Sequence, residues 1–306
     1  MGLDQRAAAE RIRYQLRLIE SIAQQAESGH FDLAAPGSEL ATDDALLGGH
    51  QTSHLVGHCL SVSQDALSTA KLILLDPITD GLRIPVVGQF PVLRTSIESA
   101  SLAIWLLAPD EQRERLCRSL RARMDEIHHE DHLVTVLTEA EEGDTKAKTA
   151  EKQKHRRENT KRSRAQKKRL RDHATDSGIG LEDINRGLPG FGPIVRASSE
   201  LVGISGNHTQ GMWAFISGLT HPSVKRSIAA SDIERLADGE VFAAKFTANL
   251  ASVVMALDAA IAAHLTALRL LARRGGRPEL AWSPGAEFPL PPGVALSPHK
   301  GGTLSD

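Results

Sequence analysis

Apolar residues recur at every third or fourth position along most of this chain, the spacing that places them on one face of an α-helix. Between residues 4 and 28 this stripe consists of Ile12, Leu16, Ile19 and Ile22. No segment reads as a convincing β-strand. The same reasoning predicts further helices over residues 42–75, 91–108, 109–137, 193–205, 208–220 and 239–274. The sequence therefore predicts an all-α fold, an antiparallel helical bundle.

Changes in composition divide the chain into segments. A Pro/Gly-rich stretch begins at Gly275, where 12 of the last 32 residues are Pro or Gly, too many for regular structure. An abruptly basic stretch interrupts the helices after residue 145. The predicted organisation is an N-terminal amphipathic helix and loop (residues 1–41), the first part of the bundle (42–145), a basic arm (146–176), the second part of the bundle (177–274) and a flexible tail (275–306).

Charge singles out the arm. The whole chain has a net charge of −2, but residues 146–171 carry seven Lys and six Arg against Glu151 and Glu158, a net +11, which leaves −13 on the rest. With little apolar content, the arm is either a solvated helix or a disordered insertion. Its clustered cations could neutralise phosphates, so the predicted partner is nucleic acid. The candidate contacts are Arg156, Arg157, Lys161, Arg162, Arg164, Lys167, Lys168 and Arg169.

Two other outcomes stay open for the arm. The acidic remainder of the chain could be its partner, or its charges could simply be solvated. A membrane partner is not expected, because the arm has almost no apolar face to insert. It also lacks the aromatic residues on which single-stranded bases stack.

One ion pair is predicted inside the bundle. Arg94 and Glu98 are the only charges in the apolar segment 91–108, and their spacing of four places them side by side on a helix. On the helix 208–220, Ser217 and His221 share a face, and His221 stands at the helix end, where a positive charge is favoured. Arg94, Glu98, Ser217 and His221 are therefore candidates for a polar site, and a structural ion pair is the alternative.

A family resemblance rests on these residues. The run Arg94-Thr95-Ser96-Ile97-Glu98, the following Trp105-Leu106-Leu107, the arginine-rich Arg113 to Arg123, and Ser217 to His221 resemble a family of uncharacterised helical proteins from actinobacteria. That family is distantly similar to the HEPN (higher eukaryotes and prokaryotes nucleotide-binding) bundles. The resemblance implies an antiparallel bundle, frequent homodimers, roles in toxin or defence systems and, in some members, RNA cleavage without metal by an arginine and a histidine.

The nuclease signature of HEPN proteins is matched only incompletely. Its nearest counterpart runs from Arg123 to His128, with Met124 where the signature has a polar residue. Arginines and histidines are numerous enough here for such spacings to occur by chance. Catalysis is therefore not supported, and the resemblance favours a binding protein.

Histidines offer an alternative function. His50, His54 and His58 are spaced four apart, and on one helix face they could contribute ligands for Zn or Fe, with a further ligand from another helix. His128, His129 and His132 resemble such a set but fit an exposed, charged helix end better. The alternatives are thus a metal-binding helical-bundle enzyme and a non-catalytic interaction or oligomerisation protein; no cofactor is favoured.

The N-terminus, the apolar segments and the cysteines indicate the cellular compartment. The residues from Met1 to Arg6 lack the apolar core of a signal peptide, and no segment reaches the run of about 20 apolar residues that spans a bilayer. Two cysteines, Cys59 and Cys117, cannot build a disulfide scaffold and suit a reducing compartment. We therefore expect a cytoplasmic protein.

Overall fold

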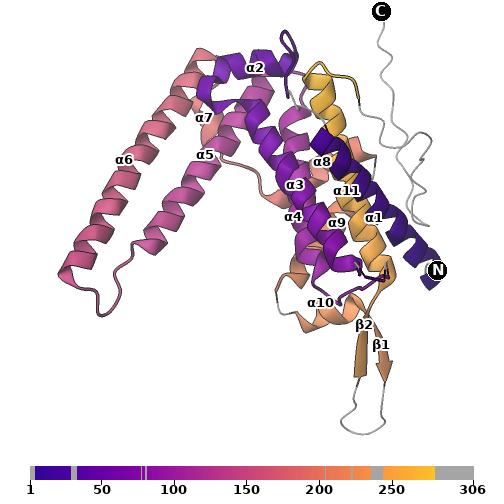
Figure 1. The fold of residues 1–306 in the computed structure, drawn as a ribbon. Helices are drawn as coiled ribbons and strands as arrows, with labels where there is room; N and C mark the ends of the chain where they lie inside the picture. Colours follow the sequence, from indigo (N-terminus) through magenta and orange to yellow (C-terminus); the bar gives the residue numbers. More distant parts are fainter. Residues whose placement is uncertain are drawn as a thin grey trace, which may run out of the picture. The chain divides into compact units, whose positions relative to one another are not determined.

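The computed structural model describes residues 4–28, 33–76, 78–79, 81–203, 205–221, 223–235 and 244–279. The chain forms two compact units. The first comprises residues 1–35, 56–108 and 190–306, and the second comprises residues 36–55 and 109–189. Helices dominate both units (Figure 1), so the predicted all-α fold is confirmed.

The first unit is a bundle around α4 (Gln89–Leu107) and α11 (Leu250–Arg274), which pack against each other. Phe90, Leu93 and Ile104 of α4 are fully buried, as is Leu257 of α11. By length and composition α11 could cross a membrane, but 72% of its most apolar stretch is buried inside the protein, as in a core helix. The other elements are α1 (Gln5–Ser28), α3 (Thr52–Leu74) from residue 56 onward, α8 (Phe191–Val202), α9 (Gly206–Leu219), α10 (Val224–Ala229), β1 (Ser231–Arg235) and β2 (Ala244–Ala248).

The second unit is a helical hairpin with a small apolar core at its base. Its long helices are α5 (Gln112–Leu137) and α6 (Lys146–Asp176), which lie side by side (Figure 1). Two short helices, α2 (Glu39–Leu47) and α7 (Leu181–Asn185), pack against α5, and the 3₁₀ turn η1 (Gly48–His50) follows α2. The core of the base consists of Leu47, Leu116, Cys117, Leu120, Leu170, Ala174, Ile179 and Ile184.

Two predicted helices were wrong in their extent. The segment 42–75 is not one helix: α2 begins after its N-cap Ser38, and the chain leaves it at Gly48, whose φ of +52° suits glycine, before α3 begins at Thr52. The segment predicted as helix from residue 239 forms a strand at 244–248, antiparallel to 231–235, and α11 begins only at Leu250. Residues 239–243 lie outside the described residues, as do residues 280–306 of the predicted tail.

Candidate functional site

The basic arm is helical. No Gly or Pro interrupts residues 146–176, and the long Lys, Arg and Gln side chains are good helix formers. Thr145 caps the start by accepting a hydrogen bond from the backbone N–H of Lys148 at 3.2 Å. Of the two states that the sequence left open, helix and disordered insertion, the structure therefore has the helix, α6.

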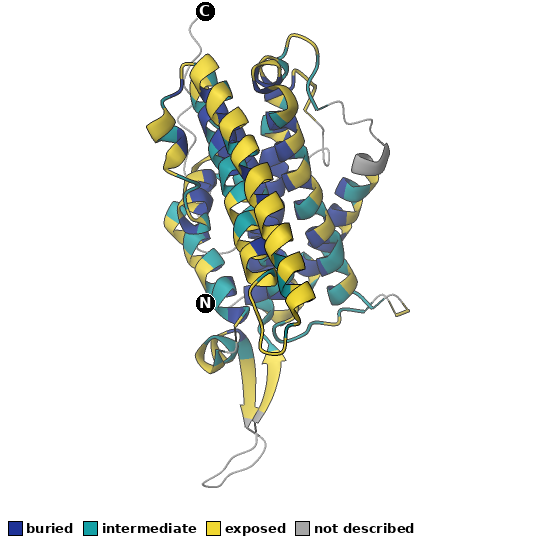
Figure 2. Ribbon diagram, turned by 90° about the vertical axis from the view of Figure 1, so that its left-hand side faces the viewer, coloured by how far each residue is buried: buried dark blue, intermediate teal, exposed yellow. Residues whose placement is uncertain are grey.

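One narrow face of α6 is buried, and it contacts α5. This face consists of Asn159, Ser163, Leu170 and Ala174, spaced by four, seven and four residues. Most other residues of α6 are exposed (Figure 2, which shows this side of the molecule). Two of the four buried residues are polar, so polar contacts must hold the distal half of the hairpin together.

Asp131 of α5 provides those contacts. Its carboxylate accepts hydrogen bonds from Asn159 Nδ2 at 3.0 Å, Ser163 Oγ at 2.7 Å and Lys167 Nζ at 2.7 Å. Burial alone would raise the pKa of Asp131, but the hydrogen bonds from Lys167 and Ser163 outweigh it and hold the pKa below its usual value. Asp131 therefore joins α5 to three residues of α6.

A second carboxylate holds the loop between the two helices. Asp144 accepts hydrogen bonds from Lys152 Nζ at 2.8 Å and from the backbone N–H of Glu141 at 3.1 Å, and it forms an ion pair with Lys148 at 2.7 Å. Hydrogen bonds from Lys148 and Lys152 lower the pKa of Asp144. Thus Lys148 and Lys152, near the start of the arm, stabilise the hairpin itself.

The eight cations predicted to contact phosphate fall into two groups, those that pair with a carboxylate and those that do not. Arg162 pairs with Glu130 at 3.2 Å, Lys167 with Asp131, and Lys168 with Asp172 at 2.7 Å. Their charges are compensated within the hairpin. The other five candidates have no carboxylate partner in the part of the chain that the structure describes: Arg156, Arg157, Lys161, Arg164 and Arg169.

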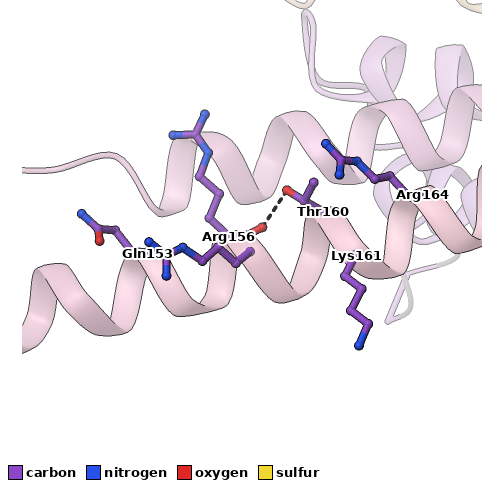
Figure 3. Close-up of a pocket in the computed structure, with 6 residues that line it drawn as sticks. Gln153, Arg156, Thr160, Lys161 and Arg164 are labelled. Carbon is purple, nitrogen blue, oxygen red and sulfur yellow. Dashed lines mark hydrogen bonds between the residues drawn. The ribbon is translucent and has the colours of Figure 1, made fainter.

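Four of these five cations lie together, and we call Arg156, Arg157, Lys161 and Arg164 the basic stripe. With Gln153 and Thr160 they line a hollow of about 520 Å³ on α6, and none of the six lining residues is acidic (Figure 3). Arg169, five residues beyond Arg164, lies about 140° further around the helix. The stripe is thus a continuous cationic surface on one side of α6.

A second hollow adjoins the basic stripe between α5 and α6. Its volume is about 280 Å³, and it shares Arg156, Thr160 and Arg164 with the first. Asn159, Ser163 and Thr135 add amide and hydroxyl groups to its lining, together with Asp131 and Lys167. In Figure 3, Arg164 extends toward the neighbouring helix while Lys161 points away from it. The stripe therefore offers guanidinium and ammonium donors over a concave surface, and neighbouring side chains add hydroxyl groups.

The predicted pair in the bundle is present in the first unit, and a tryptophan joins it. Arg94 Nε donates to Glu98 Oε1 at 2.8 Å, and Trp213 Nε1 donates to the same oxygen at 2.8 Å. Arg94 Nη1 donates to Thr220 Oγ1 at 3.2 Å. The side chains of Arg94 and Glu98 are 29% and 17% exposed, so the pair lies at the edge of the core. Its charges are satisfied by protein groups, as in a structural ion pair.

Ser217 and His221 do not complete that site. Ser217 reaches it through its backbone, whose carbonyl accepts from Thr220 Oγ1 at 2.7 Å, while its own hydroxyl is buried without a hydrogen-bond partner among the described residues. His221 is exposed at the end of α9, and within the described ranges no hydrogen bond or ion pair joins it to Arg94 or Glu98. Sequence reasoning missed Thr220, although it follows Ser217 by three residues on the same helix end.

The three histidines predicted to share one face do not do so. His50 belongs to η1, which Gln51 separates from α3, while His54 and His58 are exposed on α3. Nowhere in the described ranges do three or more His, Cys, Asp or Glu side chains gather as metal ligands would. The helical face behind the metal-binding alternative is therefore interrupted.

The described histidines of α5 do not form a group of metal ligands either. His128, His129 and His132 are exposed, and His129 pairs with Asp125 at 3.2 Å. Arg123, the first residue of the incomplete nuclease signature, instead pairs with Glu126 at 3.0 Å. Their places on a charged, exposed helix agree with the interpretation that favoured a helix end.

No family model, curated protein or solved structure matches this chain.

Proposed function

We propose that this protein binds the phosphate backbone of nucleic acid through the basic stripe on α6. The observation that carries the proposal is the hollow of about 520 Å³ lined by Arg156, Arg157, Lys161 and Arg164 and by no acidic residue. Positive charges that have no carboxylate partner repel one another at this spacing, and a polyanion relieves that repulsion. It also releases the counterions condensed on the nucleic acid.

The contacts within the hairpin favour an external partner over an internal one. Carboxylates of the same unit neutralise Arg162, Lys167 and Lys168, yet none of the described carboxylates pairs with the basic stripe. Within the described residues of the second unit, the stripe therefore has no acidic partner, which supports an external one. The ion pairs of Arg162, Lys167 and Lys168 would have to be broken before these residues could bind the phosphate backbone, so the stripe should contribute more to affinity than they do.

The chemistry of the stripe favours backbone contact over base reading. Its lining offers point charges, guanidinium groups, one hydroxyl and one amide, and no aromatic ring. Such a surface holds phosphates with little sequence preference. The proposal includes a cytoplasmic location, and the resemblance to HEPN bundles favours RNA as the ligand.

The test replaces the stripe and measures how binding depends on salt. In the variant Arg156→Gln/Arg157→Gln/Lys161→Gln/Arg164→Gln, the slope of log K against log salt should fall in magnitude by about 3 to 4, since each phosphate contact contributes roughly 0.9. We would measure the binding constant by fluorescence anisotropy between about 50 and 200 mM salt. The labelled ligands are duplex RNA, duplex DNA and single-stranded RNA.

Two controls separate the stripe from net charge and from the paired cations. Arg83→Gln/Lys225→Gln removes exposed cations from the first unit and should leave the slope unchanged. Lys168→Gln removes a cation that already has a carboxylate partner and should change the slope by much less than Lys161→Gln. The proposal would be refuted if the slope fell equally per charge removed in the stripe variants and in both controls, or if the unaltered protein did not bind.

A further inference from the structure

A second cationic cluster lies at the base of the hairpin, away from the basic stripe. The imidazole rings of His50 and His173 meet edge to face with their centroids 5.8 Å apart. Arg123 and Arg169 are close enough to act electrostatically on His50. From this arrangement we propose that His50, His173, Arg123 and Arg169 form a binding site for a phosphate group.

Three separate elements bring these side chains together. His50 comes from η1, Arg123 from α5, and Arg169 and His173 from adjacent turns of α6. The backbone of η1 packs against His173, since a Cβ added at Gly48 would lie 3.6 Å from its Cε1. Arg123 is also fixed to the turn after η1, because its Nη2 donates to the carbonyl of Gln51 at 3.4 Å. The cluster is therefore built by the tertiary structure and held in place.

Charge in the cluster is unbalanced. Burial lowers the pKa of His50, and the nearby His173, Arg123 and Arg169 lower it further, while Glu126 opposes them. Glu126 is already hydrogen-bonded to Arg123 at 3.0 Å. Gathering two guanidinium groups and two imidazoles around one carboxylate costs free energy in the free protein. A bound oxyanion would offset that cost.

The donors in the cluster suit a phosphate group. Arg123 Nε is enclosed and has no hydrogen-bond partner among the described residues, so Arg123 adds positive charge beneath the cluster. Arg169 is exposed and has no carboxylate partner in the described ranges. Guanidinium and imidazole N–H groups are preferred donors to the oxygens of phosphate. A metal ion is disfavoured, because two arginines would repel it and the described residues supply no third ligand.

The end of α6 explains only part of the cluster. A helix C-terminus favours cations in its last turns, which accounts for His173 and Arg169 as a local effect. It does not account for Arg123 and His50, which arrive from other elements. The convergence of Arg123 and His50 on the end of α6 therefore distinguishes the cluster from an ordinary helix C-terminus.

The phosphate site does not depend on the proposed function. Arg169 lies about 140° around the helix from Arg164, so loss of one surface leaves the other intact. The phosphate could belong to the end of a nucleic acid strand or be a free phosphate ion. The shared chemistry is an oxyanion of phosphorus.

Titration of the full chain with inorganic phosphate tests the site, with the imidazole resonances followed by NMR at low salt near neutral pH. We expect saturable shifts of His50 and His173, a rise in the measured pKa of His50, and no saturable change at the exposed His208 of α9. Arg169→Gln should weaken binding about tenfold or more, because one charge-assisted donor is lost. Arg157→Gln, a matched loss of charge in the basic stripe, should leave it unchanged.

The outcomes separate the two proposals and the two sources. Phosphate shifts that persist in the fourfold stripe variant support a site of its own. To identify the source, a duplex with a 5′-phosphate is compared with the same duplex ending in a 5′-hydroxyl. If only the phosphorylated duplex shifts the His50 resonances, the ligand is the end of a strand. Otherwise, free phosphate is the ligand. Shifts that never saturate, or that Arg169→Gln and Arg157→Gln weaken equally, would overturn the site.

Discussion

Asp43 and Arg115 form a buried, two-pronged ion pair at the base of the hairpin. Arg115 Nε donates to Asp43 Oδ2 at 2.7 Å and Nη2 to Asp43 Oδ1 at 3.1 Å, and the two side chains are 0% and 3% exposed. The remaining nitrogen, Nη1, donates to the carbonyls of Pro109 and Asp110 at 3.1 and 2.7 Å. Arg115 thereby ties α2 to the residues that precede α5.

Removing one partner of this pair should strongly destabilise the second unit. Asp43→Ala removes the buried carboxylate that accepts two hydrogen bonds from Arg115, and the half-exposed Glu39, 3.1 Å from Nη1, compensates only part of that charge. We therefore expect the free energy of unfolding to fall by about 3 kcal/mol. Urea unfolding followed by circular dichroism measures it. Glu10→Ala, which breaks the exposed pair of Arg6 and Glu10, should cost no more than about 0.5 kcal/mol. A loss at Asp43 as small as that at Glu10 would contradict the buried geometry.

His264 should make the first unit sensitive to acid. Burial lowers its pKa from 6.5 to about 4, and its Nδ1 lies 3.0 Å from Ser63 Oγ. As the pH falls below 6.5, the unfolded chain takes up a proton at this residue while the folded chain does not, so stability is lost between pH 6.5 and about 4. The loss should reach about 3 kcal/mol. Unfolding measured across this pH range checks it.

The variant His264→Gln isolates that contribution, because glutamine does not titrate. It should flatten the dependence of stability on pH between 6.5 and 4, whatever its cost at neutral pH. His208→Gln, at an exposed position on α9, should keep the full dependence. An unchanged slope in His264→Gln would mean that other groups cause the acid sensitivity.

Asp131→Asn should strengthen nucleic-acid binding while loosening the hairpin. The substitution frees Lys167, which lies beside Arg156 and Arg164 in the smaller hollow. One added phosphate contact should steepen the salt dependence by about 0.9. Hydrogen exchange in the distal halves of α5 and α6 should quicken, because Asp131 no longer holds Lys167 as a charged partner.

The control for that substitution is Glu20→Gln, which frees Lys71 from a 3.0 Å ion pair in the first unit. It also raises the net charge by one, yet it should change neither binding nor its salt dependence. Tighter binding by both variants would show that net charge, rather than the position of Lys167, governs affinity.

The sequence by itself determined most helices and, where the apolar stripe is regular, which face is buried. Ile12, Leu16, Ile19 and Ile22 are all at most 2% exposed, as their spacing predicts, because helical periodicity is a local property. The spacing of Arg94 and Glu98 likewise fixed their pairing within one helix. The helix end at Gly48 and the helix start at Leu250 were not predicted. A single glycine or a short strand gives a weak sequence signal when apolar stripes with helical spacing lie on both sides of it.

Only the tertiary structure decided which charges are free. Composition marks every cation between residues 146 and 171 alike. In the structure, Asp131 and Glu130 on the neighbouring helix neutralise Lys167 and Arg162, whereas the basic stripe has no carboxylate partner among the described residues of its unit. The meeting of His50 with His173 depends on the same packing. The reason is physical: a helical repeat is encoded in neighbouring residues, whereas the partner of a charge is chosen by whichever distant segment the fold places within a few ångströms of it.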